Sequence, residues 1–468
     1  MTTDYSRKWW ALAAIGSGTF MSTIDGSIVN IALNTIQNTY NASLGDVEWV
    51  VLAYLLGIVC LLPSMGRLGD MIGRRRVYMG GFILFTAASA LCGFAWNLPA
   101  LIGFRVLQAI GAAMVQAMGI ALLVQAFPAT ERGRALGYNG TIIATGVAAG
   151  PVLGGLIIAT LGWRSIFYVN IPFGILALIL SYYVLADDSK RTQQRFDYIG
   201  AALLGGALVS ILYSLTEGQH TGFGTPLTMG MFFGGFVVLA LFIWWERRID
   251  YPMLNLQFFS NHNFSLGLVA ASLQALTLQF NFVLLPLFMQ KVLNFDTGKT
   301  GLLMVVSPIA ISIFSMVSGR LSDRFGPRWV ATAGIFFLGL GLYRVSGLTA
   351  ESDVWDIVFR VFFIGTGFGL FNSANTSSVM GNVPREHGGI ANGVLSVVRS
   401  TGQIAGVTLG AFIWSTQIFA QTGQAYVDFG EAPQTALVGG FQTTMFIAAC
   451  LCWLALIPTL IRRDTTPS

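Results

Sequence analysis

Asp25 is the acidic residue that lies deepest inside a long apolar stretch of the sequence, residues 9–33. The other acidic residues fall in, or at the edges of, the connectors between such stretches. A carboxylate within a membrane span costs about 2.5–3.5 kcal/mol on insertion scales, so it usually faces water or a partner and carries function. Gly18 and Ser22 share its helical face, which indicates an inward-facing stripe. We predict that Asp25 exchanges a proton; a purely structural hydrogen bond is the alternative.

Arg105 is the residue whose charge best complements Asp25. If their two helices are antiparallel, both residues lie about 10–12 Å below the same membrane boundary, at a rise of about 1.5 Å per residue. Gln108 and Gln116 lie on the same face as Arg105, which favours an inward-facing wall over an arginine that snorkels from a lipid-facing side. We therefore predict that Arg105 is the partner of Asp25. Gln108 and Gln116 are expected to line a substrate cavity.

Amide side chains in the second half of the chain are expected to complete that cavity. They stand alone among apolar residues in the stretches 263–290 and 354–381. Polar residues inside membrane spans mostly face the protein interior or a substrate pathway. The predicted cavity residues of this half are Gln274, Gln279, Asn281, Asn372 and Asn375.

The residue types that enzymes use are not arranged for catalysis. The histidines are His220, His262 and His387, and all three lie in connectors. The sequence contains no recognisable nucleophile, histidine and acid set, no phosphate-binding glycine loop and no metal-ligand spacing. We predict no enzymatic activity, no metal and no cofactor.

The elements that must position these residues are membrane-spanning helices. Hydrophobic residues make up 54% of the 468 residues and charged residues only 10%, whereas soluble domains carry roughly 25% charge. Apolar runs of about twenty residues are typical of spanning helices rather than of barrel strands. We predict an all-α membrane protein with fourteen transmembrane helices. They are expected near residues 9–33, 48–66, 77–96, 98–126, 134–161, 165–186, 198–216, 226–245, 263–290, 299–318, 329–348, 354–381, 388–416 and 437–461.

Positive charge is distributed unevenly between the two sets of connectors. An even number of spans puts both termini on one side, and nineteen Lys and Arg residues fall in connectors on that side against four on the other. Positively charged loops stay cytoplasmic. We therefore expect both termini in the cytoplasm and a multi-pass protein of the plasma membrane, such as a bacterial inner membrane. The same bias explains the net charge of +5 without nucleic-acid binding.

The two halves of the sequence repeat each other in order and spacing. Three short segments of the first half recur 253 to 256 residues later. Duplicated helical units are common in transporter folds. We predict two six-helix halves, 1–186 and 258–468, with two inserted helices within 187–257. The matching segments are 66–70 with 319–323, 104–106 with 359–361, and the glycines at 146, 150 and 154 with those at 402, 406 and 410.

The connector after the second predicted span is rich in glycine and charge. Its acid, Asp70, can cap the following helix or pair with an arginine across the interface between the halves. We predict a latch that stabilises one access state, with a weaker copy in the second half. The latch residues are Gly66, Asp70, Gly73, Arg74 and Arg75, and the residues of the copy are Asp323 and Arg324.

Glycines recur at four-residue spacing in the predicted span 134–161. They leave a groove for a neighbouring helix, and a proline frees a carbonyl group and bends the helix. Plain packing is the alternative to a contact that flexes as the halves rock. The copy around Gly406 lacks a following proline, so we expect it to tolerate a larger side chain better. The motif comprises Gly137, Gly146, Gly150, Pro151, Gly154 and Gly155.

Nearly the whole chain resembles the major facilitator superfamily and, within it, the fourteen-helix drug:proton antiporters. The pattern within 137–155 is similar to the complete antiporter signature, and 24–33 resembles the end of the first helix in that subfamily. Asn34, Met71 and Ala109 depart from the residues usual there. The resemblance implies export of lipophilic, often cationic, drug-like compounds in exchange for protons by alternating access.

Two other functions remain open. The same fold could export or facilitate an endogenous metabolite such as an organic acid or a siderophore. A membrane receptor that does not transport is disfavoured by the intact antiporter signature. The expected partners are a small-molecule substrate, protons and the lipid bilayer, and we expect the protein to act as a monomer.

Overall fold

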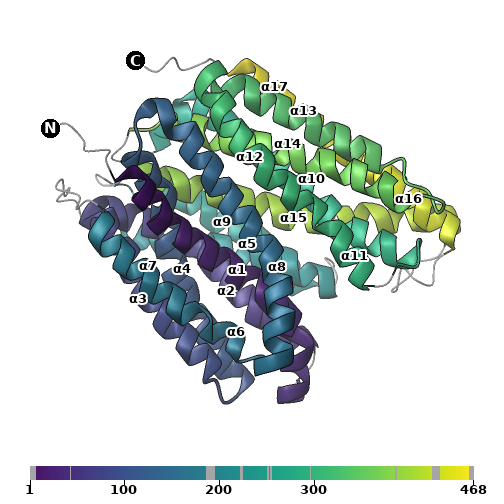
Figure 1. The fold of residues 1–468 in the computed structure, drawn as a ribbon, viewed down its shortest axis with the longest axis horizontal. Helices are drawn as coiled ribbons and strands as arrows, with labels where there is room; N and C mark the ends of the chain where they lie inside the picture. The colour runs from purple at the N-terminus through teal and green to yellow at the C-terminus, as the bar shows by residue number, and fades with distance from the viewer. Residues whose placement is uncertain are drawn as a thin grey trace. The chain divides into compact units, whose positions relative to one another are not determined.

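The computed structural model describes residues 7–462 except 43, 186–195, 222–224, 250–251, 253, 255, 296, 385–386 and 424–432. Every regular element within this part of the chain is a helix (Figure 1), which confirms the predicted all-α class. The helices are α1 (Lys8–Tyr40), α2 (Leu44–Ile72), α3 (Arg74–Gly93), α4 (Leu98–Ala126), η1 (Ala129–Glu131), α5 (Arg132–Leu161), α6 (Ser165–Tyr168), α7 (Asn170–Val184), α8 (Tyr198–Thr221), α9 (Pro226–Glu246), η2 (Leu256–Ser260), α10 (His262–Lys291), α11 (Thr297–Met304), α12 (Val306–Phe325), α13 (Pro327–Val345), α14 (Val354–Gly381), α15 (Gly388–Thr422), α16 (Gln434–Leu454) and α17 (Leu456–Ile461).

Eleven stretches of the described residues have the length and hydropathy of membrane spans. The shortest, Tyr198–Leu215, has 18 residues, which corresponds to about 27 Å of helix against a hydrocarbon core of about 30 Å. The chain is therefore a multi-pass membrane protein.

Prolines divide three of the predicted spans into two helices each. The breaks lie at Val169, Val305 and Ala455, and each break comes three residues before a proline. A proline has no N–H to donate to the carbonyl group four residues earlier, so the hydrogen-bond ladder is interrupted at that point. Val169, Val305 and Ala455 keep right-handed helical dihedral angles, so each pair of helices still forms one candidate span, as the sequence predicts.

The two halves of the chain end and begin helices with the same devices. Gly73 separates α2 from α3 with φ of 107°, and Gly326 separates α12 from α13 with φ of 85°. Only glycine adopts such angles without strain. Asn97 caps α4 by accepting from a backbone N–H of its first turn, and Asp353 caps α14 in the same way.

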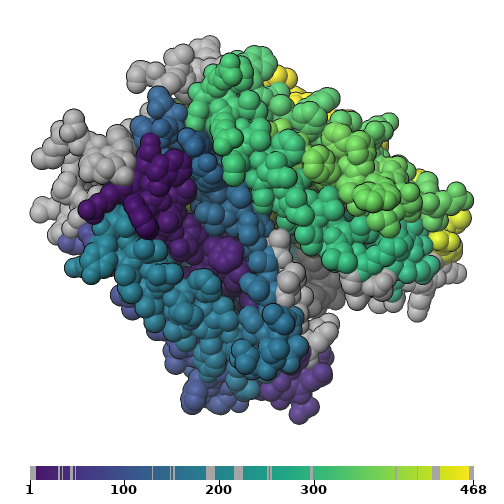
Figure 2. Space-filling model, in the orientation of Figure 1, coloured from purple at the N-terminus to yellow at the C-terminus, as the bar shows by residue number. Residues whose placement is uncertain are grey.

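The chain folds into two compact units, and unit 1 comprises Met1–Ser214, Met229–Phe258 and Val383–Val397. In this unit α1 packs against α4, α5 and α7, while α4 packs against α2 and α3. The purple surface of α1 lies beside the teal surface of α7 in Figure 2. The helix α1 is therefore enclosed by neighbours from several parts of the unit.

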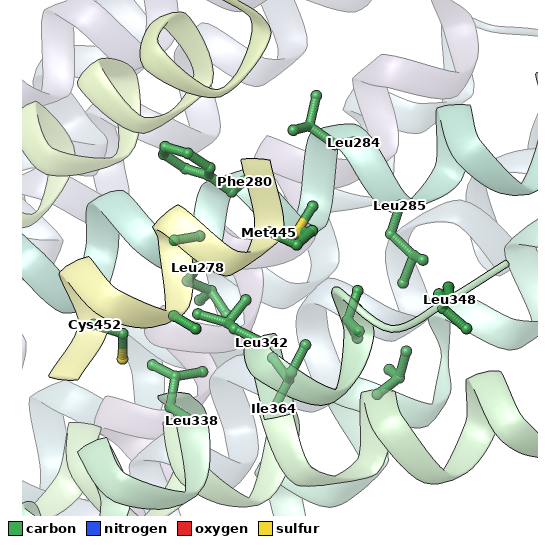
Figure 3. Packing of buried hydrophobic residues seen from close by; sticks show 14 of the residues in the cluster. Leu278, Phe280, Leu284, Leu285, Leu338, Leu342, Leu348, Ile364, Met445 and Cys452 are labelled. Carbon is green, nitrogen blue, oxygen red and sulfur yellow. The ribbon is translucent and has the colours of Figure 1, made fainter. Parts of the chain in front are cut away.

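Unit 2 comprises Leu215–Thr228, Phe259–Asn382 and Val398–Ser468. Its core is one large apolar cluster to which α10, α13, α14 and α16 contribute. Figure 3 shows Leu338 and Leu342 of α13 close to Ile364 of α14 within this cluster. Apolar side chains therefore fill the centre of this unit.

Close helix crossings identify equivalent positions in the two units. A Cβ on Gly111 of α4 would lie 2.9 Å from the carbonyl oxygen of Gly81 on α3. A Cβ on Gly367 of α14 would likewise lie 2.7 Å from the carbonyl oxygen of Gly334 on α13. Because Gly367 follows Gly111 by 256 positions, α4 and α14 match at that offset.

This offset corrects one match between the halves. The sequence aligns Arg105 with Arg360 at an offset of 255, but the helix crossing places Val361 at the position of Arg105. One residue turns a helix by about 100°, so Arg360 points elsewhere. It pairs with Asp356 on its own helix at 2.7 Å, where the Asp356 side chain is 35% exposed.

Candidate transport site

Asp25 of α1 is fully buried. Arg105 of α4 donates from Nη1 to Asp25 Oδ2 at 2.7 Å. Asp25 Oδ1 accepts from Gln108 Nε2 at 3.0 Å and from Asn170 Nδ2 at 2.7 Å. Three side-chain donors thus surround the carboxylate. The structure brings Asp25 and Arg105 into direct contact, while their role in proton coupling stays a prediction.

Arg105 is fixed by more than its acidic partner. Its Nε donates to the backbone oxygen of Val50 on α2 at 2.9 Å, and its Nη1 also donates to Gln108 Oε1 at 2.6 Å. The guanidinium carbon lies 4.0 Å from the centre of the Tyr54 ring, within cation–π range. A buried ion pair is stable only when such additional contacts compensate for the loss of water.

A second layer of polar groups holds Gln108 in place. Ser89 of α3 accepts from Gln108 Nε2 at 2.7 Å, and Cys92 Sγ lies 3.7 Å from Gln108 Oε1. We call Asp25, Arg105, Gln108, Ser89 and Asn170 the Asp25 network. Its members come from α1, α3, α4 and α7.

Asn170 and Ser89 are the network members that sequence reasoning missed. Asn170 is the first residue of α7 and lies at the helix break that precedes Pro172. Its side chain reaches α1, where Nδ2 donates to Asp25. The available signal was a lone amide within an apolar stretch, the criterion that selected Asn372.

The Asp25 network links the charge of Asp25 to the position of its neighbours. Protonation of the carboxylate would leave Arg105 as a buried cation without a counter-charge, which is strongly unfavourable. A loss of this charge would therefore favour a movement of Arg105 or of the helices around it. Such a group can couple protonation to a change of conformation.

The predicted latch residues meet the first turn of α15 within unit 1. Asp70 Oδ1 pairs with Arg74 at 2.9 Å, and Asp70 Oδ2 accepts from the backbone N–H of Ile390 at 3.3 Å. A carboxylate at a helix N-terminus interacts favourably with the helix dipole. Gly66 permits this approach, because a Cβ there would lie 2.5 Å from the carbonyl oxygen of Gly389.

The remaining latch residues occupy different environments. Gly73 supplies the turn between α2 and α3, and Arg75 donates to the backbone oxygen of Tyr182. In the second half Asp323 and Arg324 are exposed. The copy thus lacks the enclosed setting of Asp70, whose side chain is 3% exposed.

The glycine motif of α5 packs on α1, the helix that carries Asp25. A Cβ on Gly146 would lie 3.1 Å from Thr23 Cβ, and one on Gly150 would lie 1.9 Å from Ser27 Oγ. Gly154 meets Ile28 in the same way. The motif therefore gives α5 its close approach to α1.

Three other members of the motif occupy different surroundings or are not described. Gly137 is buried near the start of α5, and Gly155 has open space around it. The side chain of Pro151 lies outside the described residues.

The copy of this motif in α15 packs at least as closely, contrary to expectation. A Cβ on Gly406 would lie 2.2 Å from the carbonyl oxygen of Leu276 on α10, and one on Gly402 would lie 2.6 Å from that of Ser272. Backbone atoms cannot move aside as a side chain can. The expectation that Gly406 tolerates a larger residue better than Gly150 is therefore wrong. The absence of a proline does not determine how closely the facing helix approaches.

The predicted cavity residues divide into two groups. Gln108, Gln274, Asn281 and Asn375 are buried, whereas Gln116, Gln279 and Asn372 are partly exposed. Gln108 belongs to the Asp25 network, and Asn375 Nδ2 donates to the backbone oxygen of Gly267 at 3.3 Å. Neither amide atom of Asn281 has a hydrogen-bond partner among the residues that the structure describes. Their contact with a substrate stays a prediction.

Within the described residues, no three histidine, cysteine or acidic side chains come together as metal ligands. The chain matches the family described as Major Facilitator Superfamily over residues 15–261 and 267–468. This chain belongs to the major facilitator superfamily. It is accordingly a membrane transporter of small molecules and not an enzyme.

Relatives within the major facilitator superfamily differ in what their names say they carry. The riboflavin transporter RibZ of Clostridioides difficile is 33% identical over 458 residues, which cover 97% of this chain and 97% of that protein. The multidrug resistance protein Stp of Mycobacterium tuberculosis is 35% identical over 396 residues, covering 84% of this chain and 74% of that protein. Similarity to drug-resistance transporters is therefore established, and similarity to a vitamin transporter equally so.

A solved structure shares the fold at low sequence identity. The human organic anion transporter MFSD10 superimposes with a TM-score of 0.69 at 14% identity, covering 97% of this chain and 99% of that one. This likeness supports the major facilitator superfamily fold alone.

Proposed function

We propose that this protein is a secondary active transporter that exports lipophilic, drug-like compounds, often cationic, in exchange for protons. The observation that carries the proposal is the buried ion pair of Asp25 and Arg105, 2.7 Å apart. An intramembrane acid with a fixed arginine partner suits a residue that must hold and release a proton. The similarity to a multidrug resistance protein supports the same class of substrate.

Alternating access gives the pair its role. Asp25 takes up a proton from the outer medium and releases it towards the cytoplasm. Substrate binds more tightly when Asp25 is deprotonated. The difference in substrate affinity between the two protonation states is the coupling free energy, and by linkage it acts in both directions.

The contact of Asp70 with the start of α15 acts as the latch in this cycle. Its ion pair with Arg74 and its hydrogen bond from Ile390 stabilise the state in which they are formed. Breaking them accompanies the change to the other access state. The glycine contact between α5 and α1 provides a close surface that flexes during this change.

The transporter crosses the membrane fourteen times in this proposal. Eleven spans have the length and hydropathy to cross a bilayer. In addition, α1, α5 and α13 have 33, 30 and 19 residues, and about 20 residues are enough to cross a bilayer. Two six-helix halves, 1–186 and 258–468, then flank two inserted helices. The excess of Lys and Arg in one set of connectors supports cytoplasmic termini in a bacterial plasma membrane. The protein acts as a monomer.

An exporter of an endogenous metabolite, such as an organic acid, is the second candidate. Arg399, an arginine within α15, favours it because a cation inside the transport domain suits an acidic compound. The similarity to a riboflavin transporter is also consistent with a metabolite as substrate.

The test is an efflux assay on cells that express the protein. A panel of cationic, zwitterionic and anionic dyes is loaded, and export is followed with and without a protonophore. We expect export of at least part of the panel, and we expect the protonophore to abolish it. Export that continues unchanged after the proton gradient has collapsed would contradict proton coupling.

A further inference from the structure

Arg399 is a charged residue of unit 2 to which the proposed mechanism gives no role. It lies eleven residues after the first residue of α15, about 16 Å along the helix. Its Nη2 donates to Thr376 Oγ1 of α14 at 2.7 Å, and the side chain is partly buried. The guanidinium is therefore held between two helices and within the predicted span.

The surroundings of Arg399 in the described part of unit 2 differ from those of Arg105. Within the described part of unit 2, no carboxylate lies at ion-pair distance from it, and its buried Nε has no hydrogen-bond partner. Arg105, by comparison, pairs with Asp25 at 2.7 Å. A cation in a membrane domain without a counter-charge is unfavourable and is retained where it serves a function. The open donor on Arg399 is suited to an acceptor from outside the protein.

The neighbouring groups of Arg399 are polar but uncharged. Thr376 Oγ1, which accepts from Arg399, donates to the backbone oxygen of Asn372 at 2.8 Å. Gln279 of α10 lies against α15 two helical turns further on, where a Cβ on Gly406 would be 2.8 Å from Gln279 Cβ. Asn372 and Gln279 are both partly exposed. A ligand that reached this polar face would meet amides and a single positive charge.

The repeat shows that the fold does not demand this charge. The motif glycines of α5 and α15 match at an offset of 256, so the counterpart of Arg399 in unit 1 is Ile143. An apolar residue occupies the equivalent place in a unit of the same architecture. Arg399 is therefore not a requirement of the helix packing that both units share.

We propose that Arg399 recognises an acidic group of the transported compound, a carboxylate or a comparable organic anion. This inference rests on the proposed export function and narrows it: cationic compounds are good substrates when they also carry an acidic group, as zwitterions do. A planar guanidinium binds a carboxylate through charge-assisted hydrogen bonds. Compounds that carry only positive charge gain nothing from this group and are repelled by it.

A matched pair of dyes isolates the acidic group. Rhodamine B is a zwitterion with one free carboxylate, and rhodamine B ethyl ester is the corresponding cation. Binding of each dye to the purified full-length protein in detergent is measured by fluorescence anisotropy. We expect the wild-type protein to bind rhodamine B about 10- to 100-fold more tightly than the ester, the range for a hydrogen bond to a charged group.

Two variants and one control assign that preference to Arg399. Arg399→Gln is expected to lower rhodamine B affinity until the two dyes bind alike, with ester affinity unchanged or increased. Arg399→Lys keeps the charge and is expected to retain part of the preference. Arg360→Gln removes an arginine that already has the partner Asp356, and the preference should persist. If the role of Arg399 were purely structural, Arg399→Gln would lower the affinity for both dyes equally.

The outcomes separate this inference from the proposed function. Equal binding of the two dyes by the wild-type protein, or binding of neither, would overturn the inference whatever the variants do. If Arg399→Gln does not fold, the wild-type ratio and Arg399→Lys still decide. Proton coupling is tested separately by transport into proteoliposomes under a pH gradient. A clear rhodamine B preference without gradient-driven transport would support Arg399 recognition and reject the proposed antiport.

Discussion

The Asp25 network of unit 1 and the apolar core of unit 2 occupy equivalent places in two copies of one helical frame. The crossing glycines match α4 with α14 at an offset of 256 and α3 with α13 at 253. The motif glycines contact Thr23 in one unit and Ala275 in the other, so α1 matches α10 at 252. The counterparts of Asp25, Ser89, Arg105 and Gln108 are accordingly Thr277, Leu342, Val361 and Ile364.

Unit 2 therefore serves as an internal control for unit 1. Its four counterparts are all buried, and three of them belong to its apolar cluster. Replacing a buried ion pair by well-packed apolar residues is often neutral or stabilising by about 1–4 kcal/mol. A frame that packs well around leucine and valine does not need an aspartate and an arginine to fold. The charged residues of unit 1 are then best explained by function.

The largest effect that would test this comparison is the loss of coupling in Asp25→Asn. The amide cannot exchange a proton, so we expect no gradient-driven export and no proton release when substrate is added to purified protein in weakly buffered detergent. The matched change in unit 2 is Thr277→Val, which we expect to leave both readouts near wild type. Proton release by Asp25→Asn equal to that of the parent would place the coupling site elsewhere.

A second prediction concerns the stability of the pair. Arg105→Met leaves Asp25 as a buried acid without its partner, and we expect a loss of about 3–5 kcal/mol together with loss of export. The double variant Asp25→Leu/Arg105→Met imitates the apolar counterpart and should recover most of the stability without recovering export. Thermal unfolding in detergent measures the first quantity and dye efflux the second. A double variant no more stable than the single one would show that unit 1 needs its charges to fold.

For the glycine contacts we expect a smaller effect on stability, and here the substitution in unit 2 should cost at least as much as the one in unit 1. Gly406→Ala meets the backbone of Leu276 and should cost about 1–3 kcal/mol, at least as much as Gly150→Ala, which meets the side chain of Ser27. Gly155→Ala has open space and serves as the neutral control. The midpoint of thermal unfolding at matched expression ranks the three. A wild-type midpoint for Gly406→Ala would refute the close approach of α15 to α10.

The smallest expected difference lies in the latch. Asp70→Asn removes the ion pair with Arg74 and weakens the interaction with the start of α15, worth about 0.3–2 kcal/mol for a charge at a helix end. We expect slower turnover with unchanged substrate binding. Asp323→Asn alters an exposed residue and should be milder. Complete loss of binding in both variants would argue for a structural role instead.

A feature of the fold or of the site can be predicted when it has a direct physical counterpart in the sequence. Apolar length predicts the spanning helices, and the shared depth of Asp25 and Arg105 predicts their contact, because helical rise is constant. Aligning identical residues of the two halves does not reveal the one-residue shift that separates Arg360 from the position equivalent to Arg105. Nor does a glycine reveal which helix it faces, so the close packing of Gly406 appears only in three dimensions.

Cys92 offers a way to observe the Asp25 network without altering it. Its thiol lies 3.7 Å from Gln108 Oε1, the oxygen that also accepts from Arg105. The S–H stretching vibration absorbs infrared light where other protein groups do not, and its frequency falls as the thiol donates more strongly. A change in the charge of Asp25 that shifts Gln108 would therefore change this band. If Asp25 exchanges a proton as proposed, the S–H band of Cys92 is expected to report that exchange, once it is distinguished from the bands of Cys60, Cys450 and Cys452.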